Sequence, residues 1–503
     1  MHSIDTLFNF ILILSLNRDP YFMLNSYDAI IIGSGFGGAI PALRLAQAGK
    51  RVLVLEQGRV FTEKDFKQTW DFKYSSQFLS VTTSDDYNSF FRAGMVLGGG
   101  SVVFSGLMNR SPSETFQFVD YNGYKVWPDA ITRQVLDPYY AMVENMMQIR
   151  QVTWNEVSKT GGMFAKLLAN VGLTCDRARY PYVNCRQCGY CEAGCIYGAK
   201  QSLMHNYIPQ AQAAGVEFRT GCRAMLIQPN TSSYTVSYIG PNSGYGNTMA
   251  SVQGTAVILA GGAIYTPELL LRSKQYLPNL SDQVGKNFNN NGAARFGIEL
   301  PDGLPSIECY KGMDSAGVMT YAYWPDYRIT IEAGTSPASI FTLNIHRQGA
   351  PGWGLEFKQW AKSVYPSKLI IGNIMGLVTG EGYVYLKNDL PTVHLPLTQN
   401  LTNYINRVIT PIQELADKNK AFLLQTLNSG YMYSISHMLG TCRMGDDPTR
   451  SVADPNGQIR NYYGLFVTDS SSLPGGTGVN PSTTIAANAE RIASYIVNNW
   501  NNW

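Results

Sequence analysis

The 503-residue sequence has few charged residues, no long apolar segment and no concentration of basic side chains. Charged residues make up 15% of the chain, and the formal net charge is only +3. A charge this small, with no basic stripe, argues against a nucleic-acid partner. Hydrophobic residues make up 45% of the chain, which is typical of a globular protein, and its length suits two joined domains.

The longest apolar stretch near the N-terminus, residues 7–16, is about half as long as the roughly 20 residues that a membrane-spanning helix needs. It is also a poor signal peptide, because residues 1–5 contain no Lys or Arg and no small-residue cleavage site follows. We therefore expect no transmembrane segment and interpret residues 1–23 as an extension.

Four of the eight cysteines lie close together, as Cys185, Cys188, Cys191 and Cys195. This spacing does not suit a disulfide framework in a large chain, so we expect a reducing, cytoplasmic environment. The spacing is that of a ferredoxin cluster segment, with Ile196 in place of the usual proline. Three alternatives stay open: an iron–sulfur cluster, a zinc site, or cysteines without metal, as free thiols or with an incidental disulfide. We favour cysteines without metal, because zinc sites usually have a longer gap between cysteine pairs.

Residues 27–56 have the sequence of a complete strand–helix–strand nucleotide-binding unit. The patterning predicts a buried parallel strand over residues 27–33, a helix over 42–49 and a second strand that ends at Glu56. The loop between the first strand and the helix consists of Gly33, Ser34, Gly35, Phe36, Gly37 and Gly38. The first glycine permits a tight turn, the second lets the backbone approach a pyrophosphate, and the third lets the helix pack on the strand.

The helix N-terminus then attracts the phosphates, and Glu56 accepts hydrogen bonds from a ribose. This loop predicts a dinucleotide site but does not distinguish NAD from FAD.

Three further segments resemble signatures of the glucose–methanol–choline (GMC) oxidoreductases, a family of flavoenzymes. They are residues 96–101 (Val-Leu-Gly-Gly-Gly-Ser), residues 262–273 after an apolar strand, and a C-terminal set at 437–445, 464–469 and 479–481. Because these anchors follow in the family's order, the resemblance covers nearly the whole chain.

The resemblance implies an α/β fold, with a Rossmann-type FAD-binding domain and a substrate domain built on an antiparallel sheet. It implies that the cofactor is FAD and that, besides the loop and Glu56, it is contacted by Gly98, Gly99, Gly100, Ser101, Asp469, Asn480 and Pro481. We expect non-covalent FAD, because tethered flavins of this family often attach to a histidine near the glycine segment, and this chain has neither His nor Cys there.

The expected flavin domain is discontinuous, because its motifs lie at both ends of the chain. We assign it residues 24–110, 171–290 and 430–503. The substrate domain then takes residues 111–170 and 291–429. Alternating apolar and polar residues at 327–332 and 382–386 suit an antiparallel sheet in that domain.

Oxidising an alcohol requires a group that holds the hydroxyl and removes its proton while the carbinol hydrogen leaves as hydride. Histidine suits this task because its ordinary pKa lies near neutrality, and an amide can hold the same oxygen without titrating. Of the five histidines, only His437 lies in a glycine-punctuated segment between apolar stretches. In the family, the His and Asn at the positions of His437 and Asn480 face the flavin's reactive edge, so the resemblance implies that they form the catalytic pair.

Within the family the chain is most similar to the cholesterol-oxidase-like branch, on residues 198–202, 277–285 and 331–337. In sterol oxidases a glutamate at the place of Glu332 moves a proton during double-bond isomerisation, so Glu332 is a third catalytic candidate. A paired or solvated carboxylate is the alternative for this residue. The branch carries Val-Asn after its glycine segment, whereas this chain has Val103 and Phe104.

Together these features predict a GMC-type FAD-dependent alcohol oxidase or dehydrogenase that passes a hydride from the CH–OH group of a small molecule to flavin. Aromatic-rich segments favour an apolar or sterol-like substrate, and the electron acceptor is oxygen or an unidentified compound. A non-redox lyase or isomerase that retains FAD is the main alternative, because a fold does not fix chemistry. An electron-transfer module is a third, and it depends on a cluster at the four cysteines.

Overall fold

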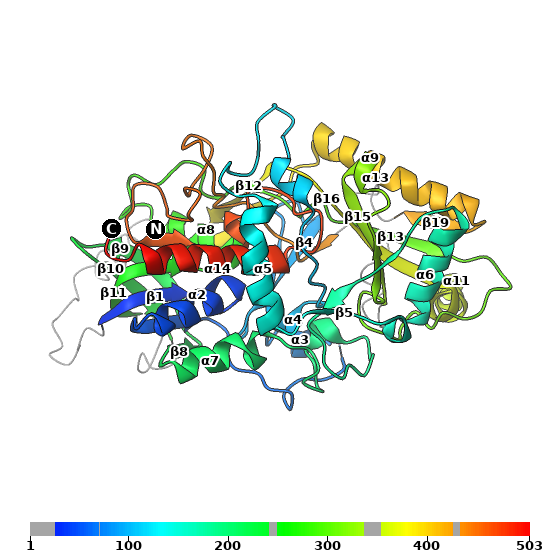
Figure 1. Cartoon of the computed structure of the whole chain (residues 1–503), viewed down its shortest axis with the longest axis horizontal. Helices are drawn as coiled ribbons and strands as arrows, with labels where there is room; N and C mark the ends of the chain where they lie inside the picture. The colour runs from blue at the N-terminus through cyan, green and yellow to red at the C-terminus, as the bar shows by residue number, and fades with distance from the viewer. Residues whose placement is uncertain (1–25, 70, 241–248, 336–353, 426–432, 503) are drawn as a thin grey trace, which may run out of the picture.

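The computed structural model describes residues 26–502, apart from residue 70 and the segments 241–248, 336–353 and 426–432. Two large sheets lie side by side, one towards each end of the molecule (Figure 1). No helix within the described ranges is both long and apolar enough to cross a membrane.

The first sheet carries the glycine loop at the end of its central strand. Its strands are, in order, β8 (Glu217–Thr220), β2 (Val52–Glu56), β1 (Ser26–Ile32), β11 (Met249–Leu259), β10 (Tyr234–Ile239) and β9 (Arg223–Pro229), with β21 (Leu465–Val467) also paired to β11. β1 runs parallel to β2 and β11, and β11 runs parallel to β21. β1 and β2 are almost entirely buried, as their continuous runs of Val, Ile and Leu predict. Strands far apart in the sequence therefore meet at the loop.

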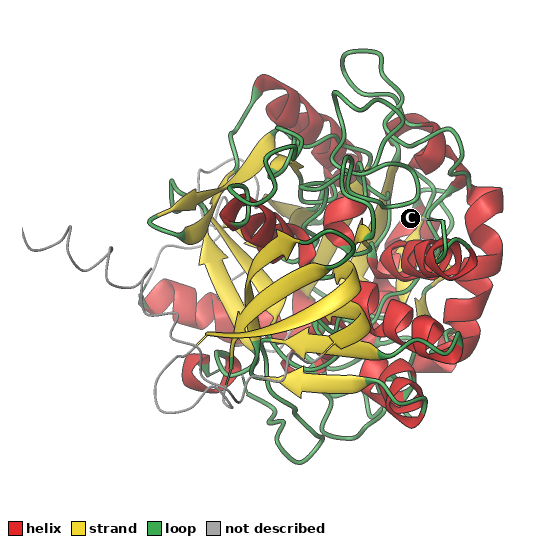
Figure 2. Cartoon of the chain, turned by 90° about the vertical axis from the view of Figure 1, so that its left-hand side faces the viewer, coloured by secondary structure: helices red, strands yellow, loops and turns green. Residues whose placement is uncertain are grey.

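Helices pack against this sheet and against one another. α2 (Phe36–Gln47) leaves the glycine loop and packs on α14 (Ser482–Asn498), the last helix of the chain. α14 also contacts α5 (Arg133–Met146), and α7 (Tyr207–Ala213) lies beside α2. Figure 2 views the molecule from this end and shows helices gathered along one side of the strands. α8 (Gly262–Arg272) begins where β11 ends.

The second sheet is antiparallel, as the alternating sequence predicts. Its strands are, in order, β19 (Phe422–Gln425), β13 (Ala294–Glu299), β16 (Leu369–Gly376), β15 (Ile329–Gly334), β14 (Val318–Thr320) and β6 (Asp176–Arg177). One hydrophobic core joins this sheet to three helices, α6 (Lys159–Asn170), α11 (Leu355–Ser363) and α13 (Gln399–Lys418). These helices lie around the sheet at the right of Figure 1.

Smaller elements connect the two sheets. One small sheet contains β3 (Leu79–Thr83), β4 (Ser89–Gly94) and β20 (Tyr433–Ile435), and another contains β12 (Lys286–Phe288), β17 (Gly382–Lys387) and β18 (Leu390–His394). The remaining short elements are α3 (Phe72–Ser75), α4 (Gly100–Val103), α9 (Trp324–Tyr327), α12 (Tyr365–Lys368), β5 (Arg150–Gln151) and β7 (Arg179–Tyr180).

Residues 111–170, which we assigned to the substrate domain, contact both halves of the molecule: α5 packs on α14, whereas α6 packs on β15. β6, from a segment assigned to the flavin domain, pairs with β14 of the second sheet. The domain boundaries drawn from the sequence therefore stay a prediction.

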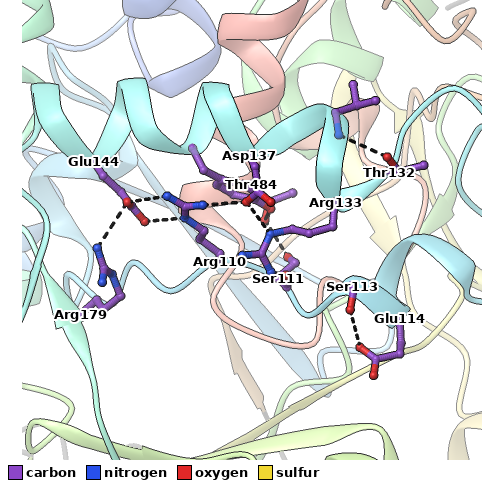
Figure 3. A network of polar contacts seen from close by, with 12 residues as sticks. Arg110, Ser111, Ser113, Glu114, Thr132, Arg133, Asp137, Glu144, Arg179 and Thr484 are labelled. Carbon is purple, nitrogen blue, oxygen red and sulfur yellow. Dashed lines mark hydrogen bonds and ion pairs between the residues drawn. The ribbon is translucent and has the colours of Figure 1, made fainter.

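A polar network holds α5 and the start of α14 together (Figure 3). Arg110 donates to both carboxylate oxygens of Glu144, at 2.8 Å each, and to Asp137 at 2.6 Å, so α5 is tied to the strand-like segment after α4. The hydroxyls of Ser111 and Thr484 lie 2.7 Å apart in the interior. Because Thr484 lies in the first turn of α14, this network fixes the position at which the chain leaves Pro481.

Candidate active site

One cavity extends from the glycine loop of the first sheet to strands β13, β15 and β16 of the second. It brings together most of the residues singled out from the sequence. They are Gly33, Gly35, Phe36, Gly37, Glu56, Gly99, Gly100, Glu332, His437, Asp469, Asn480 and Pro481. The remaining three, Gly38, Gly98 and Ser101, lie behind the described cavity wall.

These three residues support the wall. Gly38 packs so closely that a Cβ there would lie 1.9 Å from the carbonyl oxygen of Gly33. Ser101 donates to the carbonyl of Gly98 at 2.7 Å and accepts the amide N–H of Leu203 at 3.1 Å. These residues hold the segments that reach the cavity, and their predicted contact with the cofactor stays a prediction.

The glycine loop leaves room where a dinucleotide would approach. Gly33 has a φ of +100°, which a residue with a side chain rarely adopts, and it makes the turn out of β1. A Cβ added at Gly35 or at Gly100 would meet no protein atom within 4 Å, so both glycines border open space. Gly35 also precedes the first turn of α2, whose amides favour an anion. The loop therefore fits a pyrophosphate.

Glu56 lies at the end of β2, as predicted, and it is almost completely buried. Its carboxylate accepts the amide and the hydroxyl of Ser34 at 3.0 and 2.7 Å, and the amide of Gly58 at 2.7 Å. Burial raises the pKa of Glu56, and these hydrogen bonds oppose the rise. Ser34 Oγ in turn accepts the amide of Gly98 at 2.9 Å. Glu56 thus ties the glycine loop to the second glycine segment, besides facing the cavity.

Asp469 follows β21 and joins three of the signature segments. Its carboxylate accepts the amide of Gly262 at 2.7 Å, the hydroxyl of Thr266 at 2.5 Å and the amide of Ser471 at 2.8 Å. Its backbone lies directly against Gly37, where an added Cβ would be 2.8 Å from the Asp469 Cα. Burial raises the pKa of Asp469, and the donors offset this.

His437, Asn480 and Glu332 come from distant parts of the chain and line the same cavity. His437 follows β20, which pairs with β4 so that Ile435 lies opposite Phe91. Burial, together with the positive charge of Arg295, lowers the pKa of His437 to about 4, so the imidazole is neutral at pH 7.

Three buried oxygens of the cavity lining lack a hydrogen-bond partner among the described residues: Oδ1 of Asn480, Oε2 of Glu332 and Oδ2 of Asp314. The other oxygen of Glu332 accepts from the amide of Asn373 at 2.8 Å. Burial raises the pKa of Glu332 to about 7, and the side chains of Asn373 and Asn480 partly oppose the rise. Since buried polar atoms are normally paired, these oxygens fit a site that binds a polar group.

Lys200 lies in the Gly-Ala-Lys segment at 198–200, and no role was predicted for it. Its ammonium is buried and donates to the carbonyl oxygens of Val102 at 2.8 Å, Phe104 at 3.0 Å and Cys191 at 2.6 Å. Through these hydrogen bonds, the Lys200 ammonium connects the cysteine segment to α4 and Phe104, which border the cavity. Only its three-dimensional partners distinguish it from a surface lysine.

Cys185, Cys188, Cys191 and Cys195 line a second, small pocket, together with Lys200. Burial raises the pKa of Cys185 to about 11 and that of Cys191 higher still, so both are protonated thiols at neutral pH. Within the described ranges, no group of three or more His, Cys, Asp or Glu side chains is arranged to hold a metal ion. The iron–sulfur and zinc interpretations therefore gain no support from this geometry.

The sequence matches the GMC oxidoreductase family over residues 27–291 with the family's N-terminal region and over residues 401–489 with its C-terminal region. The chain belongs to this family, which confirms the predicted family and enzyme class. The mixed α/β fold with an antiparallel second sheet is likewise confirmed. Members of the family generally bind FAD.

Similar proteins include a cholesterol oxidase of Acinetobacter baumannii, 26% identical over 93% of this chain and 94% of that protein. A cholesterol oxidase of Mycobacterium tuberculosis is 24% identical over 94% of this chain and 91% of that one. A long-chain-alcohol oxidase of Arabidopsis thaliana is 24% identical, and the matched region covers 93% of this chain and 67% of that protein. The crystal structure of pyridoxine 4-oxidase from Mesorbium loti has the same fold, with a TM-score of 0.66, 17% identity and coverage of 93% and 98%.

Gly37→Ala is expected to weaken FAD retention by about 5- to 150-fold, because a crowded methyl group costs about 1–3 kcal/mol and here it would push the loop away from Asp469. The measurement is the flavin-to-protein ratio and the dissociation constant after removal and readdition of FAD. Gly162→Ala is the matched control, because its Cβ would meet no atom within 4 Å. Wild-type affinity in Gly37→Ala would show that the loop does not carry the cofactor.

Lys200→Met is expected to loosen α4 and Phe104, because each buried carbonyl left without a donor costs about 1–3 kcal/mol. We expect a lower melting temperature and a changed visible spectrum of the bound flavin. Lys200→Arg should restore part of both, whereas Lys166→Met, on the exposed surface of α6, should alter neither. An unchanged flavin spectrum in Lys200→Met would contradict the proposed link between Lys200 and the cavity.

Proposed function

We propose that this protein oxidises an alcohol with FAD bound along the cavity, and that His437 and Asn480 hold the reacting hydroxyl. The observation that carries this proposal is the continuous cavity, which joins the glycine loop to His437, Asn480 and Glu332. The similarity to proteins named cholesterol oxidase and long-chain-alcohol oxidase supports alcohol oxidation in general.

The residues that would hold FAD are those of the glycine loop, with Glu56 near the ribose and Gly99 and Gly100 along the flavin. Bound there without a covalent link, FAD supplies the acceptor for the hydride of the carbinol carbon. The second sheet closes the cavity on the side opposite the glycine loop. Glu332 of β15 is part of this wall.

Neutral His437 donates its ring N–H to the substrate oxygen, and the amide of Asn480 holds the same oxygen. Glu332 is a group in this wall whose charge changes near neutral pH, because burial brings its pKa to about 7; burial also raises the pKa of Asp314 in the same wall. Its unpartnered Oε2 faces the same region as Asn480, so ionised Glu332 can take up the proton that the hydroxyl loses.

We expect molecular oxygen to be the final electron acceptor, in line with the oxidases among the similar proteins. A non-redox lyase or isomerase on the same fold is the alternative, and the raised pKa of Glu332 suits a proton transfer in either reaction. A lyase or isomerase forms product without consuming an electron acceptor, so acceptor consumed per product formed separates the two.

His437→Ala is expected to slow flavin reduction by alcohol about 100-fold or more, because removing one hydrogen-bond donor to an oxygen that gains negative charge costs about 100- to 1,000-fold. The measurement is the rate of flavin bleaching after rapid anaerobic mixing, with FAD content and melting temperature checked in parallel. His205→Ala is the control, because His205 pairs with Glu63 outside the cavity wall. An unaffected rate in His437→Ala would remove His437 from the mechanism.

Glu332→Gln is expected to remove the pH dependence of flavin reduction near neutrality. The carboxylate is the proton acceptor, so in the wild-type enzyme activity falls as the pH drops through about 7 and Glu332 becomes protonated. His437 is neutral above about pH 4 and does not titrate in that range. If Glu332→Gln keeps the wild-type pH profile, a group other than Glu332 causes the loss of activity below about pH 7.

A further inference from the structure

A polar row on the second sheet forms the wall that faces the catalytic pair. Arg295 of β13 pairs with Asn373 of β16, and Asn373 pairs with Glu332 of β15. Directly paired residues of neighbouring strands present their side chains on the same face, and all three line the cavity. The opposite face of the sheet packs against α6, α11 and α13 through apolar side chains.

Further charged groups lie in the same cavity wall. Arg92 and Glu192 form an ion pair at 3.0 Å, with 13% and 19% of their side chains exposed, and Asp314 lies among them. Arg295 is close enough to Glu192, Asp314 and Glu332 for their charges to act on its pKa, which burial lowers. Buried ions are costly unless hydrogen bonds compensate them. A wholly apolar molecule seated against this wall would displace water from the ions and replace none of its hydrogen bonds.

We propose that the substrate is a compact polar alcohol with a hydrogen-bond acceptor remote from its reacting hydroxyl, and that Arg295 and Asn373 bind this acceptor. The proposal rests on the proposed function of the site and names the class of its substrate. It replaces the apolar or sterol-like substrate that aromatic composition favours. A guanidinium has donors only, so the group it binds must be an acceptor, either a carboxylate or a neutral oxygen or nitrogen.

The register of the sheet sets the size of this molecule. Neighbouring strands lie about 4.8 Å apart, so β13 and β15, on either side of β16, are separated by roughly 10 Å. With Glu332 and Asn480 at the reacting hydroxyl, Arg295 reaches an acceptor about one ring away from it. A single ring or a short polyol fits this spacing, whereas a steroid skeleton extends well past it.

Three alcohols with one ring and one carbinol group test the proposal in the FAD-loaded enzyme. Benzyl alcohol has no remote acceptor, 4-(hydroxymethyl)benzamide has a neutral one, and 4-(hydroxymethyl)benzoate has an anionic one. We expect at least one acceptor-bearing compound to reduce flavin anaerobically with a second-order rate constant tenfold or more above that of benzyl alcohol, 1-decanol and detergent-dispersed cholesterol. Which of the two is preferred then distinguishes a neutral from an anionic acceptor.

Arg295→Met should bring the rate constant of flavin reduction by the preferred compound close to that of benzyl alcohol. Arg295→Lys should retain part of the difference between the two rate constants. Arg407→Met, on the exposed surface of α13, should leave that difference unchanged. Calorimetry gives a readout independent of turnover: benzoate or benzamide should bind the wild-type enzyme more tightly than toluene, and Arg295→Met should lose this difference.

The inference is overturned if benzyl alcohol, decanol or cholesterol is oxidised as efficiently as the acceptor-bearing compounds, or if Arg295→Met slows all of them equally. In that case flavin reduction itself still occurs, and the proposed function stands. If none of the alcohols reduces flavin and none of the ring ligands binds, the proposed function fails together with the inference.

Discussion

The hydrogen bonds to the carboxylate of Asp469 are the interaction on which the site depends. They join the start of α8, through Gly262 and Thr266, to the C-terminal segment that contains Ser471. The same residue lies against Gly37 at the start of α2. A buried carboxylate is stable only when donors surround it, so this one position forces three distant segments to meet. Asn480 enters the cavity because the chain then runs directly on from Asp469 into α14.

The second sheet adds the chemistry that the first sheet lacks. The nucleotide end of the cavity is built from glycines, backbone amides and two buried carboxylates, which suits the recognition of phosphates and ribose. The other end brings ionisable side chains from β13 and β15 to His437 and Asn480. Burial lowers the pKa of His437 and raises that of Glu332 to about 7, so His437 stays neutral near pH 7 while Glu332 changes its charge there and can take up a proton.

Local patterns carried most of what the sequence predicted. The strand–helix–strand unit with Glu56 at its end depends on residues within about one βαβ unit, and short-range periodicity is enough to recognise it. Likewise, β15 and β17 follow from alternating side chains. His437 and Asn480 depended on family resemblance, because their meeting point is set by the pairing of β20 with β4 and by the packing of α14, which no local pattern reveals.

The features that the sequence did not predict arise from register and burial. Arg295, Asn373 and Glu332 form a row only because three strands far apart in the chain align in one register. Lys200 resembles any other lysine until its three carbonyl partners are known. For the four cysteines, the ferredoxin-like spacing was ambiguous, and the structure shows half-buried thiols around a small pocket without an arrangement of described ligands for a metal.

Anaerobic addition of a primary alcohol to the purified FAD-loaded enzyme tests the role of this cavity most directly. If the hydroxyl is held by His437 and Asn480 for hydride transfer, the absorbance of oxidised flavin falls, one carbonyl product forms per flavin, and oxygen restores the absorbance. Conversion of substrate with the flavin absorbance unchanged would contradict alcohol oxidation at this site and would show that FAD has no redox role in the reaction.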